Sequence, residues 1–439
     1  MTYQPELSAP HHSRKPPARP PAVVMNMFYT GLGIARSLGE RGIRVIGLSA
    51  HRIYGNYTRY AEVRKAPDSR ERPEELLQFL LDLGPKLRSP GVLFPTRDDD
   101  LVFLDRFRRE LSRYYVPVLP EAEALDACLD KWQTYLCALK AGVPAPRSWK
   151  IENRQELLSV ASDIAFPCVI KPLSSFHWRR NGNWERVGSR KAICVSDLDE
   201  LYREYDTISP AEQRILLQEA IPGEDTRLAI AACHMGPHSE LVAAFGARKV
   251  LQIPKGFGTG CIVETGENPE VIQLSLRLLK EMRLTGLAEV EFKWDSVRSE
   301  YKLIEINARP WDQHRLGYTC GADLIYSAYL HFAGLPCPQP QSQHHRPCKW
   351  VAEDAFLFAL LRSLWRRNRR FHSLRRLAAG RRIYGIWDIH DPAPFLAWAL
   401  HAIRTGLTAA LRQLTCTVQD RLRRPYRSEP NTQLKAMSK

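Results

Sequence analysis

Two acidic segments separated by a short polar turn constrain the fold of this chain more than any other feature. The first reads Leu-Ala-Glu-Val-Glu-Phe-Lys-Trp-Asp over 287–295, and the second reads Tyr-Lys-Leu-Ile-Glu-Ile-Asn-Ala-Arg over 301–309. Side chains alternate along a strand, so an antiparallel hairpin predicts one polar face and one apolar face. The polar face would carry Glu289, Glu291, Glu305 and Asn307. The apolar face would carry Val290, Phe292, Ile304 and Ile306 and pack inward.

The polar face of this hairpin indicates a site for a divalent cation. Several carboxylates on one face repel one another unless positive charge lies between them. Magnesium is the natural candidate, because it prefers oxygen ligands and shares its coordination shell with substrate phosphates. Arg309, two residues further on, can then bind a phosphoryl group in transfer. The alternative is a solvent-exposed strand face that is merely charged.

The sequence before the hairpin indicates an α/β domain followed by an α+β domain. Residues 22–122 show short apolar strands alternating with helical segments, which predicts a small parallel α/β domain. Gly31 and Gly33 resemble part of a dinucleotide fingerprint, but Arg36 occupies the place of the third glycine. We therefore interpret these glycines as a tight turn that opens a helix. Residues 123–336 mix strands with a helix over 126–141 and another over 269–282.

Four sequence motifs, in this order, resemble those of the ATP-grasp superfamily. They are Asp-Lys at 130–131 before a helix ending in Gly-Val-Pro-Ala-Pro, Phe-Pro-Cys-Val-Ile-Lys-Pro at 166–172, Leu-Gln-Glu-Ala-Ile-Pro-Gly-Glu-Asp at 217–225, and the Glu-x-Asn-x-Arg hairpin. Within the superfamily the chain resembles the carboxylate-amine ligase group that includes D-aspartate ligase. The resemblance implies an ATP-grasp fold preceded by a Rossmann-like pre-ATP-grasp domain.

The resemblance also implies the roles of individual residues. Lys131 and Lys171 would reach the phosphates of ATP, and Arg309 would be the catalytic residue. The backbone around Gln218, Glu219 and Ile221 would bind adenine, and Asp225 would hold the ribose. Glu291, Glu305 and Asn307 would bind Mg²⁺, with Mn²⁺ as an alternative, while the role of Glu289 stays open.

Two loops of the resemblance are expected to face the phosphates and the substrate. The loop over 174–191 would cover the phosphates, although here it is rich in Trp and Arg rather than in glycine. The loop over 252–260 would face the carboxylate substrate, because its glycines let backbone N–H groups approach an oxyanion. The candidate substrate contacts are Arg248, Lys255, Gly258 and His314.

The activity implied by the resemblance is ATP-dependent formation of an amide or peptide bond, in which ADP is released and a carboxylate is activated as an acyl phosphate. The partners would be a small-molecule carboxylate and an amine. The alternative is a non-catalytic ATP-binding protein or scaffold whose basic tail binds a partner or a membrane surface.

Charge is concentrated at the end of the chain. Residues 340–439 contain 19 Lys and Arg against 6 Asp and Glu, whereas residues 21–339 carry no net charge. We therefore expect activity on small molecules and no nucleic-acid partner. Residues 1–21 would be a disordered leader, and 337–439 a basic helical extension whose helices contact a membrane, contact a protein or pack against the body. The ten cysteines suggest buried reduced thiols and a cytoplasmic protein, with peripheral contact at the inner membrane face as an option.

Overall fold

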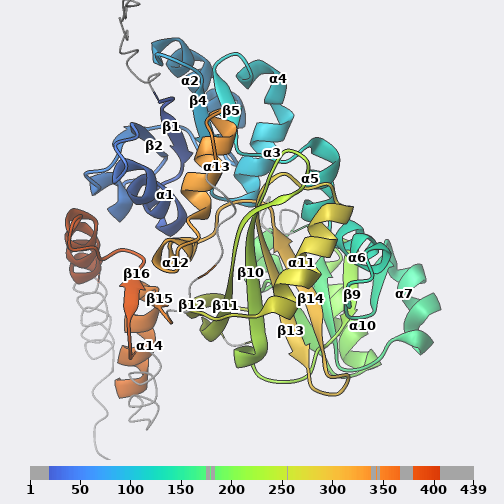
Figure 1. The fold of residues 1–439 in the computed structure, drawn as a ribbon. Helices are drawn as coiled ribbons and strands as arrows, with labels where there is room; N and C mark the ends of the chain where they lie inside the picture. The colour runs from blue at the N-terminus through green and yellow to red at the C-terminus, as the bar shows by residue number, and fades with distance from the viewer. Residues whose placement is uncertain are drawn as a thin grey trace, which may run out of the picture.

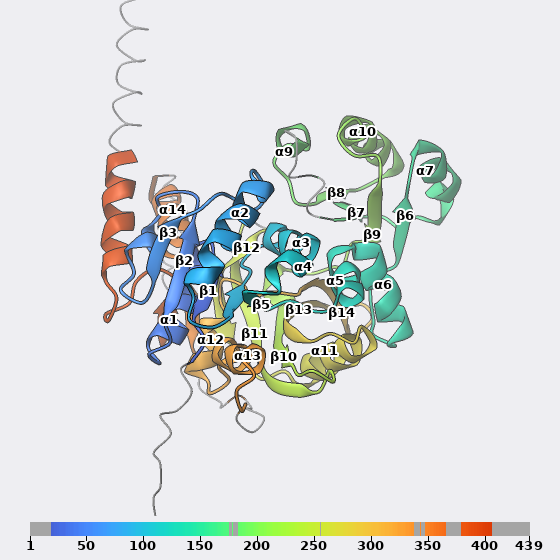
Figure 2. The ribbon, with the colours of Figure 1, turned by 90° about the horizontal axis from the view of Figure 1, so that it is seen from above.

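The architecture consists of three β-sheets with helices between and around them (Figure 1). The computed structural model describes residues 19–174, 178, 183–254, 256–337, 343, 347–365 and 379–405. Seen from above, the four-stranded sheet and its helices form a lobe on the side of the molecule away from the C-terminal segment (Figure 2).

The first sheet is parallel, with strand order β3-β2-β1-β4-β5. Its strands are β1 (Ala22–Met25), β2 (Val45–Ser49), β3 (Glu62–Lys65), β4 (Gly91–Phe94) and β5 (Tyr115–Pro117). The helices between them are α1 (Tyr29–Gly39), α2 (Pro73–Leu83), α3 (Asp98–Arg106) and α4 (Arg108–Leu111). The three inner strands are buried along their whole length, as expected for a parallel sheet that is covered on both faces.

The glycines of α1 are required for packing. A Cβ atom on Gly31 would lie 1.9 Å from the carbonyl oxygen of Asn26, and one on Gly33 would lie 2.7 Å from the His314 ring. No other residue type fits at either place without a shift of the backbone or of a buried ring. The glycine pattern is thus explained by the close approach of α1 to its neighbours.

The second sheet is antiparallel, with strand order β6-β9-β7-β8. Its strands are β6 (Ser148–Ile151), β7 (Cys168–Pro172), β8 (Ile193–Val195) and β9 (Ile215–Glu219). The helices α7 (Arg154–Val160), α9 (Asn183–Arg186) and α10 (Leu198–Ile208) belong to the same lobe (Figure 2). A separate core that includes Trp178, Tyr205 and Ile215 holds this lobe together.

The third sheet has seven strands in the order β14-β13-β10-β11-β12-β15-β16. Its strands are β10 (Leu228–Met235), β11 (Leu241–Ile253), β12 (Thr259–Thr265), β13 (Gly286–Asp295), β14 (Glu300–Asn307), β15 (Lys349–Val351) and β16 (Arg382–Tyr384). Helix α11 (Pro269–Glu281) packs on one face, and α13 (Leu324–Phe332) packs on the other. Together with the short α12 (Arg315–Thr319), α13 joins this sheet to α1 and hence to the parallel sheet.

The remaining short elements connect these units. They are the 3-10 turns η1 (Tyr54–Tyr57), η2 (Gly84–Lys86), η3 (Ala161–Asp163) and η4 (Asp225–Arg227).

The helix expected over 126–141 is in fact two helices, α5 (Ala122–Leu129) and α6 (Lys131–Lys140). Asp130 separates them, and its carboxylate accepts hydrogen bonds from the backbone N–H groups of Trp132 and Gln133. An aspartate at this position caps the second helix, because it satisfies N–H groups that have no partner within the helix. The break places Lys131 at the first turn of α6.

The C-terminal segment is more than the helical extension expected over 337–439. Its strands β15 and β16 continue the seven-stranded sheet, since β15 pairs with β12 and β16 pairs with β15. Helix α14 (Glu353–Trp365) and a helix over 393–405 follow these strands at one end of the molecule (Figure 1). The three-residue segments at 349–351 and 382–384 are too short to be recognised as strands from their own sequence. Within the described residues, no helix has the length and apolar character needed to cross a bilayer.

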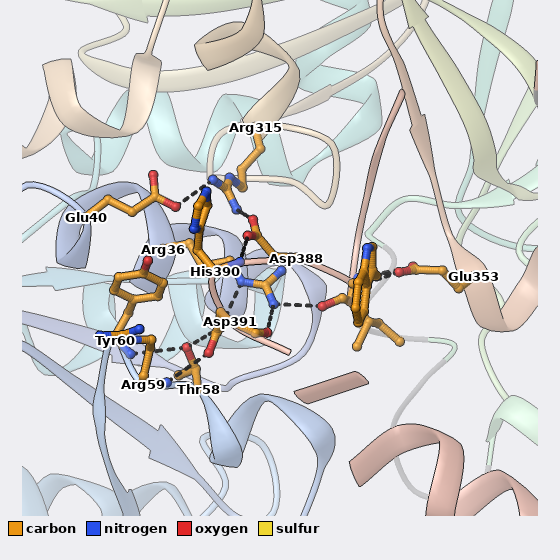
Figure 3. A network of polar contacts seen from close by, with 12 residues as sticks. Arg36, Glu40, Thr58, Arg59, Tyr60, Arg315, Glu353, Asp388, His390 and Asp391 are labelled. Carbon is orange, nitrogen blue, oxygen red and sulfur yellow. Dashed lines mark hydrogen bonds and ion pairs between the residues drawn. The ribbon is translucent and has the colours of Figure 1, made fainter. Parts of the chain in front are cut away.

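The stretch over 385–391 is anchored to the parallel sheet domain by a buried ion pair (Figure 3). Arg36 Nε lies 3.0 Å from Asp391 Oδ2, and each side chain is 1% exposed. Asp391 also accepts hydrogen bonds from the hydroxyl of Thr58 and the backbone N–H of Arg59. This part of the tail therefore packs against the body of the protein.

Nine of the ten cysteines lie in the described residues, and all nine are unpaired. Six of them are buried, as expected, whereas Cys194 and Cys337 are exposed. Cys416 lies outside the described residues.

Buried histidines predict a loss of stability in mild acid. Burial lowers the pKa of His234 to about 3, and its ring lies 2.6 Å from the Ser327 hydroxyl and 3.1 Å from the His331 ring. The unfolded chain binds a proton at this residue below about pH 6.5, whereas the folded protein does not, so stability falls as the pH drops from 6.5 toward 3. At pH 5 we expect a loss of about 2 kcal/mol from His234 relative to pH 7.

Urea unfolding at pH 7 and pH 5 checks this expectation. The variant His234→Gln should lose less stability between the two pH values than the wild type does. The matched control is His238→Gln at an exposed position. An equal pH dependence in wild type and His234→Gln would refute the assignment.

Candidate active site

The polar face of the hairpin forms as the sequence predicts. In the register of β13 and β14, Glu289 lies opposite Asn307 and Glu291 lies opposite Glu305. Directly paired residues on one face have Cβ atoms about 5 Å apart, so these side chains are neighbours. Glu289 and Glu291 are buried, and Glu305 is half-buried. The structure thus brings three carboxylates and one amide together on one face of the sheet.

A β-bulge changes the apolar face of the hairpin. The register shifts after Glu291, so that Phe292 pairs with Leu303 and leaves Ile304 unpaired. Leu303 takes the inward position in the core beside Ile306. Ile304, which was expected to pack inward, instead lines a cavity together with Glu305. The bulge therefore adds an apolar side chain to the floor of the site.

A lysine that the motifs did not reveal lies on the same face. Lys249 on β11 is buried, and its Nζ is 2.7 Å from Glu291 Oε2. Burial acts to lower the pKa of Lys249, but the charges of Glu291, Glu305 and Glu289 and the hydrogen bond to Glu291 together raise it. The alternation of side chains along β11 could have revealed this lysine. Lys249 lies two residues after Ala247, the end of the apolar run 241–247, and therefore points to the same face as Ala247.

The carboxylates of this face differ in charge state. Burial and the neighbouring Glu291 carboxylate raise the pKa of Glu289 to about 8. The pKa of Glu305 is lowered although burial opposes this, because Lys249, Lys131, Lys171 and Lys191 lie around it. Glu305 is therefore ionised at neutral pH at the centre of a cluster of lysines.

Lys171 faces Glu305 from the four-stranded sheet. It lies on β7 inside an apolar strand, and its Nζ donates a 2.7 Å hydrogen bond to the Gln218 side chain on β9. Gln218 in turn donates to the hydroxyl of Ser148 on β6, at 3.1 Å. Burial lowers the pKa of Lys171 to about 8, while Glu305 acts in the opposite direction. The three strands fix the position of this ammonium group.

Lys131 joins the same site through the start of α6. Its backbone N–H donates to the carbonyl oxygen of Leu173, just past the end of β7, at 2.8 Å. This bond ties the first turn of α6 to the strand that carries Lys171. Both lysine side chains line the same two cavities.

The segment after β9 lies at the far end of the site. Ala220, the first residue after β9, donates its backbone N–H to the carbonyl oxygen of Pro167, and Ile221 follows it. The carbonyl oxygen of Ile221 accepts a 2.9 Å hydrogen bond from Lys293. The carboxylate of Asp225 accepts a 3.0 Å hydrogen bond from the backbone N–H of Gly256. The loop that contains Gly258 thereby contacts the segment that was predicted to bind adenine and ribose.

Arg309 is held by two oxygen atoms from different domains. Its Nε lies 2.7 Å from Asp98 Oδ1 at the start of α3, and its Nη2 lies 3.2 Å from Asn307 Oδ1. Asn307 also donates through Nδ2 to Glu289 Oε2, at 3.0 Å. The open role of Glu289 is thus to orient the Asn307 amide. Asp98 reaches this site from the parallel sheet domain.

Two adjoining cavities connect these groups. The first has a volume of about 420 Å³ and extends from the segment after β9 to Glu291. The second continues past Glu305 to Asn307, Arg309 and Asp98. Six residues line both: Lys131, Lys171, Lys191, Gln218, Ile304 and Glu305. The result is one continuous cleft between the four-stranded and the seven-stranded sheet.

The predicted metal ligands fit a magnesium ion that is bound together with phosphate. Within the described ranges, no group of three or more His, Cys, Asp or Glu side chains is arranged as a complete metal site. The predicted set contains two carboxylates, Glu291 and Glu305, and the amide of Asn307. Mg²⁺ commonly uses one or two carboxylates and completes its shell with phosphate oxygens and water. The buried, mutually repelling carboxylates of this face are the chemistry that a divalent cation stabilises.

Two of the four candidate substrate contacts, Arg248 and His314, lie away from the cleft. Arg248 points to the opposite face of β11 from Lys249, because neighbouring residues of a strand alternate, and it pairs with Glu264 at 2.6 Å. His314 is buried between α1 and α12 and contacts the carbonyl oxygen of Thr30 at 3.1 Å. Lys255 lies outside the described residues. Gly258 lines the first cavity.

The loop over 174–191 is described only in part. Residues 175–177 and 179–182 lie outside the described residues, while Trp178 is buried in the core of the lobe. Trp178, Trp184, Arg190 and Lys191 line the second cavity. Lys191 also donates a 3.0 Å hydrogen bond to the hydroxyl of Thr259 on β12. The described end of the loop therefore spans from one sheet to the other.

Comparisons with known proteins give a consistent result. No protein-family model matches the chain. It is 22% identical to D-aspartate ligase of Enterococcus faecium (strain Aus0004) over 301 residues, which cover 65% of this chain and 69% of that protein. It is 26% identical to the vancomycin/teicoplanin A-type resistance protein VanA of Enterococcus faecium over 231 residues, covering 48% of this chain and 59% of that protein.

The solved structures that resemble the chain share its fold. An ADP complex of N5-carboxyaminoimidazole ribonucleotide synthetase superposes with a TM-score of 0.60 at 14% identity, covering 80% of this chain and 86% of that one. L-amino acid ligase from Bacillus licheniformis gives a TM-score of 0.54 at 13% identity, covering 72% and 74%. Together with the sequence similarity to two ligases and the cleft between the two sheets, these findings support the resemblance of the chain to the ATP-grasp superfamily and its carboxylate-amine ligases.

Proposed function

We propose that the protein is an ATP-dependent carboxylate-amine ligase that forms an amide or peptide bond through an acyl phosphate and releases ADP. The observation that carries this proposal is the single cleft in which Lys131 and Lys171 face Glu291, Glu305 and Asn307, with Arg309 beyond them. The relatives named D-aspartate ligase and L-amino acid ligase are ligases of this kind.

The first cavity is the proposed nucleotide site. The backbone at Glu219 and Ile221 would bind adenine, and Ile304 provides an apolar surface for the ring. Asp225 lines the same cavity, contacts the loop at Gly256 and would hold the ribose. Gln218 fixes Lys171 through its side chain, so its role is to position that lysine. Lys131, Lys171 and Lys191 would then neutralise the phosphates, since a compact ammonium acts as a point charge.

Glu291, Glu305 and Asn307 are the proposed ligands of Mg²⁺. The bound ion would neutralise the phosphate oxygens and orient the phosphoryl group that is transferred. Lys249 already neutralises part of the negative charge of these carboxylates, because it forms an ion pair with Glu291.

The chemistry has two steps. The substrate carboxylate attacks the γ-phosphorus of ATP, and ADP leaves, which gives an acyl phosphate. The amine then attacks the acyl carbon, and phosphate leaves. Arg309 lines the second cavity together with the lysines that are proposed to bind the phosphates. There it stabilises the negative charge that develops in both steps. Closure of the lobe over the cleft excludes water, which would hydrolyse the acyl phosphate.

We propose three functional regions on this basis. Residues 22–122 are a Rossmann-like pre-ATP-grasp domain that contributes Asp98 to the cleft. Residues 123–336 are the ATP-grasp domain. Residues 337–439 add two strands to that domain and dock on the first one through Asp391.

ADP release tests the proposal. The purified protein is incubated with ATP, Mg²⁺ and pooled amino acids, with and without hydroxylamine to trap an acyl phosphate. Release that appears only with certain pools, together with a hydroxamate, supports the ligase. ATP binding without release in any pool would favour the non-catalytic ATP-binding alternative.

The variant Arg309→Ala tests the role of the guanidinium. We expect kcat to fall by roughly a hundredfold to a thousandfold, because a charge-stabilising donor is lost from the transition state. The Kd for ATP should change little, as measured by the fluorescence of Trp178 and Trp184 at the cleft. The matched control is Arg248→Ala, on the other face of the sheet, which should retain wild-type turnover. Equal losses in the two variants would contradict the assignment.

A further inference from the structure

The acidic side chains of the described C-terminal segment all form ion pairs or hydrogen bonds with other groups of the protein. The described part of 337–405 contains four of them. Asp391 pairs with Arg36 and Asp388 pairs with Arg315 (Figure 3). Asp354 accepts a hydrogen bond from Tyr29. The fourth, Glu353, accepts from the backbone N–H groups of Ile386 and Trp387 within the segment. Each of these four carboxylates therefore has a partner within the protein, and Asp391 is buried.

Apolar side chains of the same segment face outward. In the helix over 393–405, Leu396, Leu400 and Ile403 are spaced by four and three residues and form one stripe. Their exposed fractions are 57%, 57% and 58%. An exposed stripe of large aliphatic residues is costly in water unless a partner covers it.

The stripe continues onto the body of the protein. Phe28 and Tyr57 are also exposed, and they line a groove together with Leu396 and Leu400. Arg52 and Arg404 line the same groove, and both are exposed. We call this the outer face, defined by Phe28, Arg52, Tyr57, Leu396, Leu400, Ile403 and Arg404. It combines aliphatic and aromatic side chains with positive charge.

Two stretches of the sequence that lie outside the described residues contain many basic residues and few acidic ones. Residues 366–378 contain six Arg and no acidic residue, and residues 406–439 contain seven Lys and Arg against two Asp and Glu. Helix α14 lies at the same end of the molecule and exposes Leu357, Phe358 and Leu361 (Figure 1). Charge of one sign next to exposed aliphatic side chains is the complement of a bilayer with anionic headgroups above its acyl chains.

We propose that the outer face binds the surface of a membrane that contains anionic lipids. The aliphatic stripe enters the headgroup region, and the arginines contact lipid phosphates. A nucleic acid would use the positive charge but would leave the aliphatic stripe in water, so the stripe favours a lipid surface. This inference does not rest on the proposed ligase activity, because none of its residues lines the cleft.

Vesicle co-sedimentation of the full-length protein tests the proposal. The probes are phosphatidylcholine vesicles and vesicles in which part of the phosphatidylcholine is replaced by phosphatidylglycerol. The test variant is Leu400→Asp with Ile403→Asp, at exposed positions that tolerate charge. The matched control is Leu158→Asp on α7, at the other end of the molecule, where the side chain is 53% exposed (Figure 2).

The expected result is binding to the anionic vesicles that exceeds binding to the neutral ones and decreases as salt is raised. The double variant should bind at least roughly tenfold more weakly, because two apolar side chains no longer enter the bilayer. The control variant should bind as the wild type does. Absence of binding, equal binding to both kinds of vesicle, or equal losses in the two variants would overturn the proposal. A wild-type dimer that the double variant dissociates, without vesicle binding, would overturn it in favour of self-association.

Discussion

Replacing Glu305 by glutamine is expected to reduce turnover by roughly a thousandfold or more while ATP still binds. Glu305 lies opposite Glu291 in the hairpin and is surrounded by four lysines, so it joins the proposed metal ligands to the lysines that are proposed to bind the phosphates. Glutamine keeps the shape of the side chain but removes the negative charge that a divalent cation needs. The measurement is kcat for ADP release, with ATP binding followed separately by tryptophan fluorescence.

The control for Glu305→Gln is Glu264→Gln on β12. Glu264 is a carboxylate of the same sheet, but it pairs with Arg248 away from the cleft. This variant should retain wild-type turnover and stability. Near-normal turnover of Glu305→Gln would remove the metal assignment, whereas weakened ATP binding with unchanged kcat would move Glu305 from catalysis to nucleotide binding.

The sequence predicted the polar face of the hairpin because alternation is a local rule. Glu289, Glu291, Glu305 and Asn307 follow it, and the structure pairs them as expected. Ile304 did not follow it, since a β-bulge shifts one strand by a residue and no sequence pattern marks that shift. Alternation therefore assigned the four polar side chains to the correct face and failed at Ile304, which lies at the bulge.

Contacts between distant segments were the part that sequence could not supply. Lys249 matters because β11 lies two strands away from Glu291, and that adjacency depends on the strand order of the whole sheet. Its neighbour Arg248, a candidate substrate contact in the sequence analysis, points to the opposite face of β11 and pairs with Glu264. His314 was chosen for its chemistry, but the close approach of α1 at Gly33 gives it a packing role.

The C-terminal segment shows the same limit at the level of whole elements. The amphipathic pattern of its sequence predicted helices, and α14 is one of them. The strands β15 and β16 have only three residues each, so their own sequence does not distinguish them from the loops around them. They form because β12 offers an edge with unpaired backbone groups. The docking of Asp391 on Arg36, 355 residues earlier, is likewise a property of the assembled fold.

The buried pair of Arg36 and Asp391 leads to a second large expected effect. Removing one partner of a buried ion pair costs about 3–5 kcal/mol, because it leaves the other charge buried without compensation. Arg36 also donates to the carbonyl oxygens of Ile386 and Asp391, so Arg36→Met removes three contacts at once. We expect the free energy of unfolding in urea to fall by this amount. Limited proteolysis should then cleave within 385–391 before it cleaves elsewhere in the described chain.

Two further variants separate the charge from the packing at this site. In Arg36→Met with Asp391→Leu, no buried charge is left unpaired, so part of the lost stability should return even though the ion pair is absent. In Arg44→Met, an exposed arginine that pairs with Glu62 at 3.0 Å is lost, and the cost should be at most about 1 kcal/mol. If Arg36→Met were no more destabilising than Arg44→Met, the ion pair would not anchor the tail. The strands β15 and β16 and the contacts of Asp388 with Arg315 and of Asp354 with Tyr29 would then hold the C-terminal segment in place.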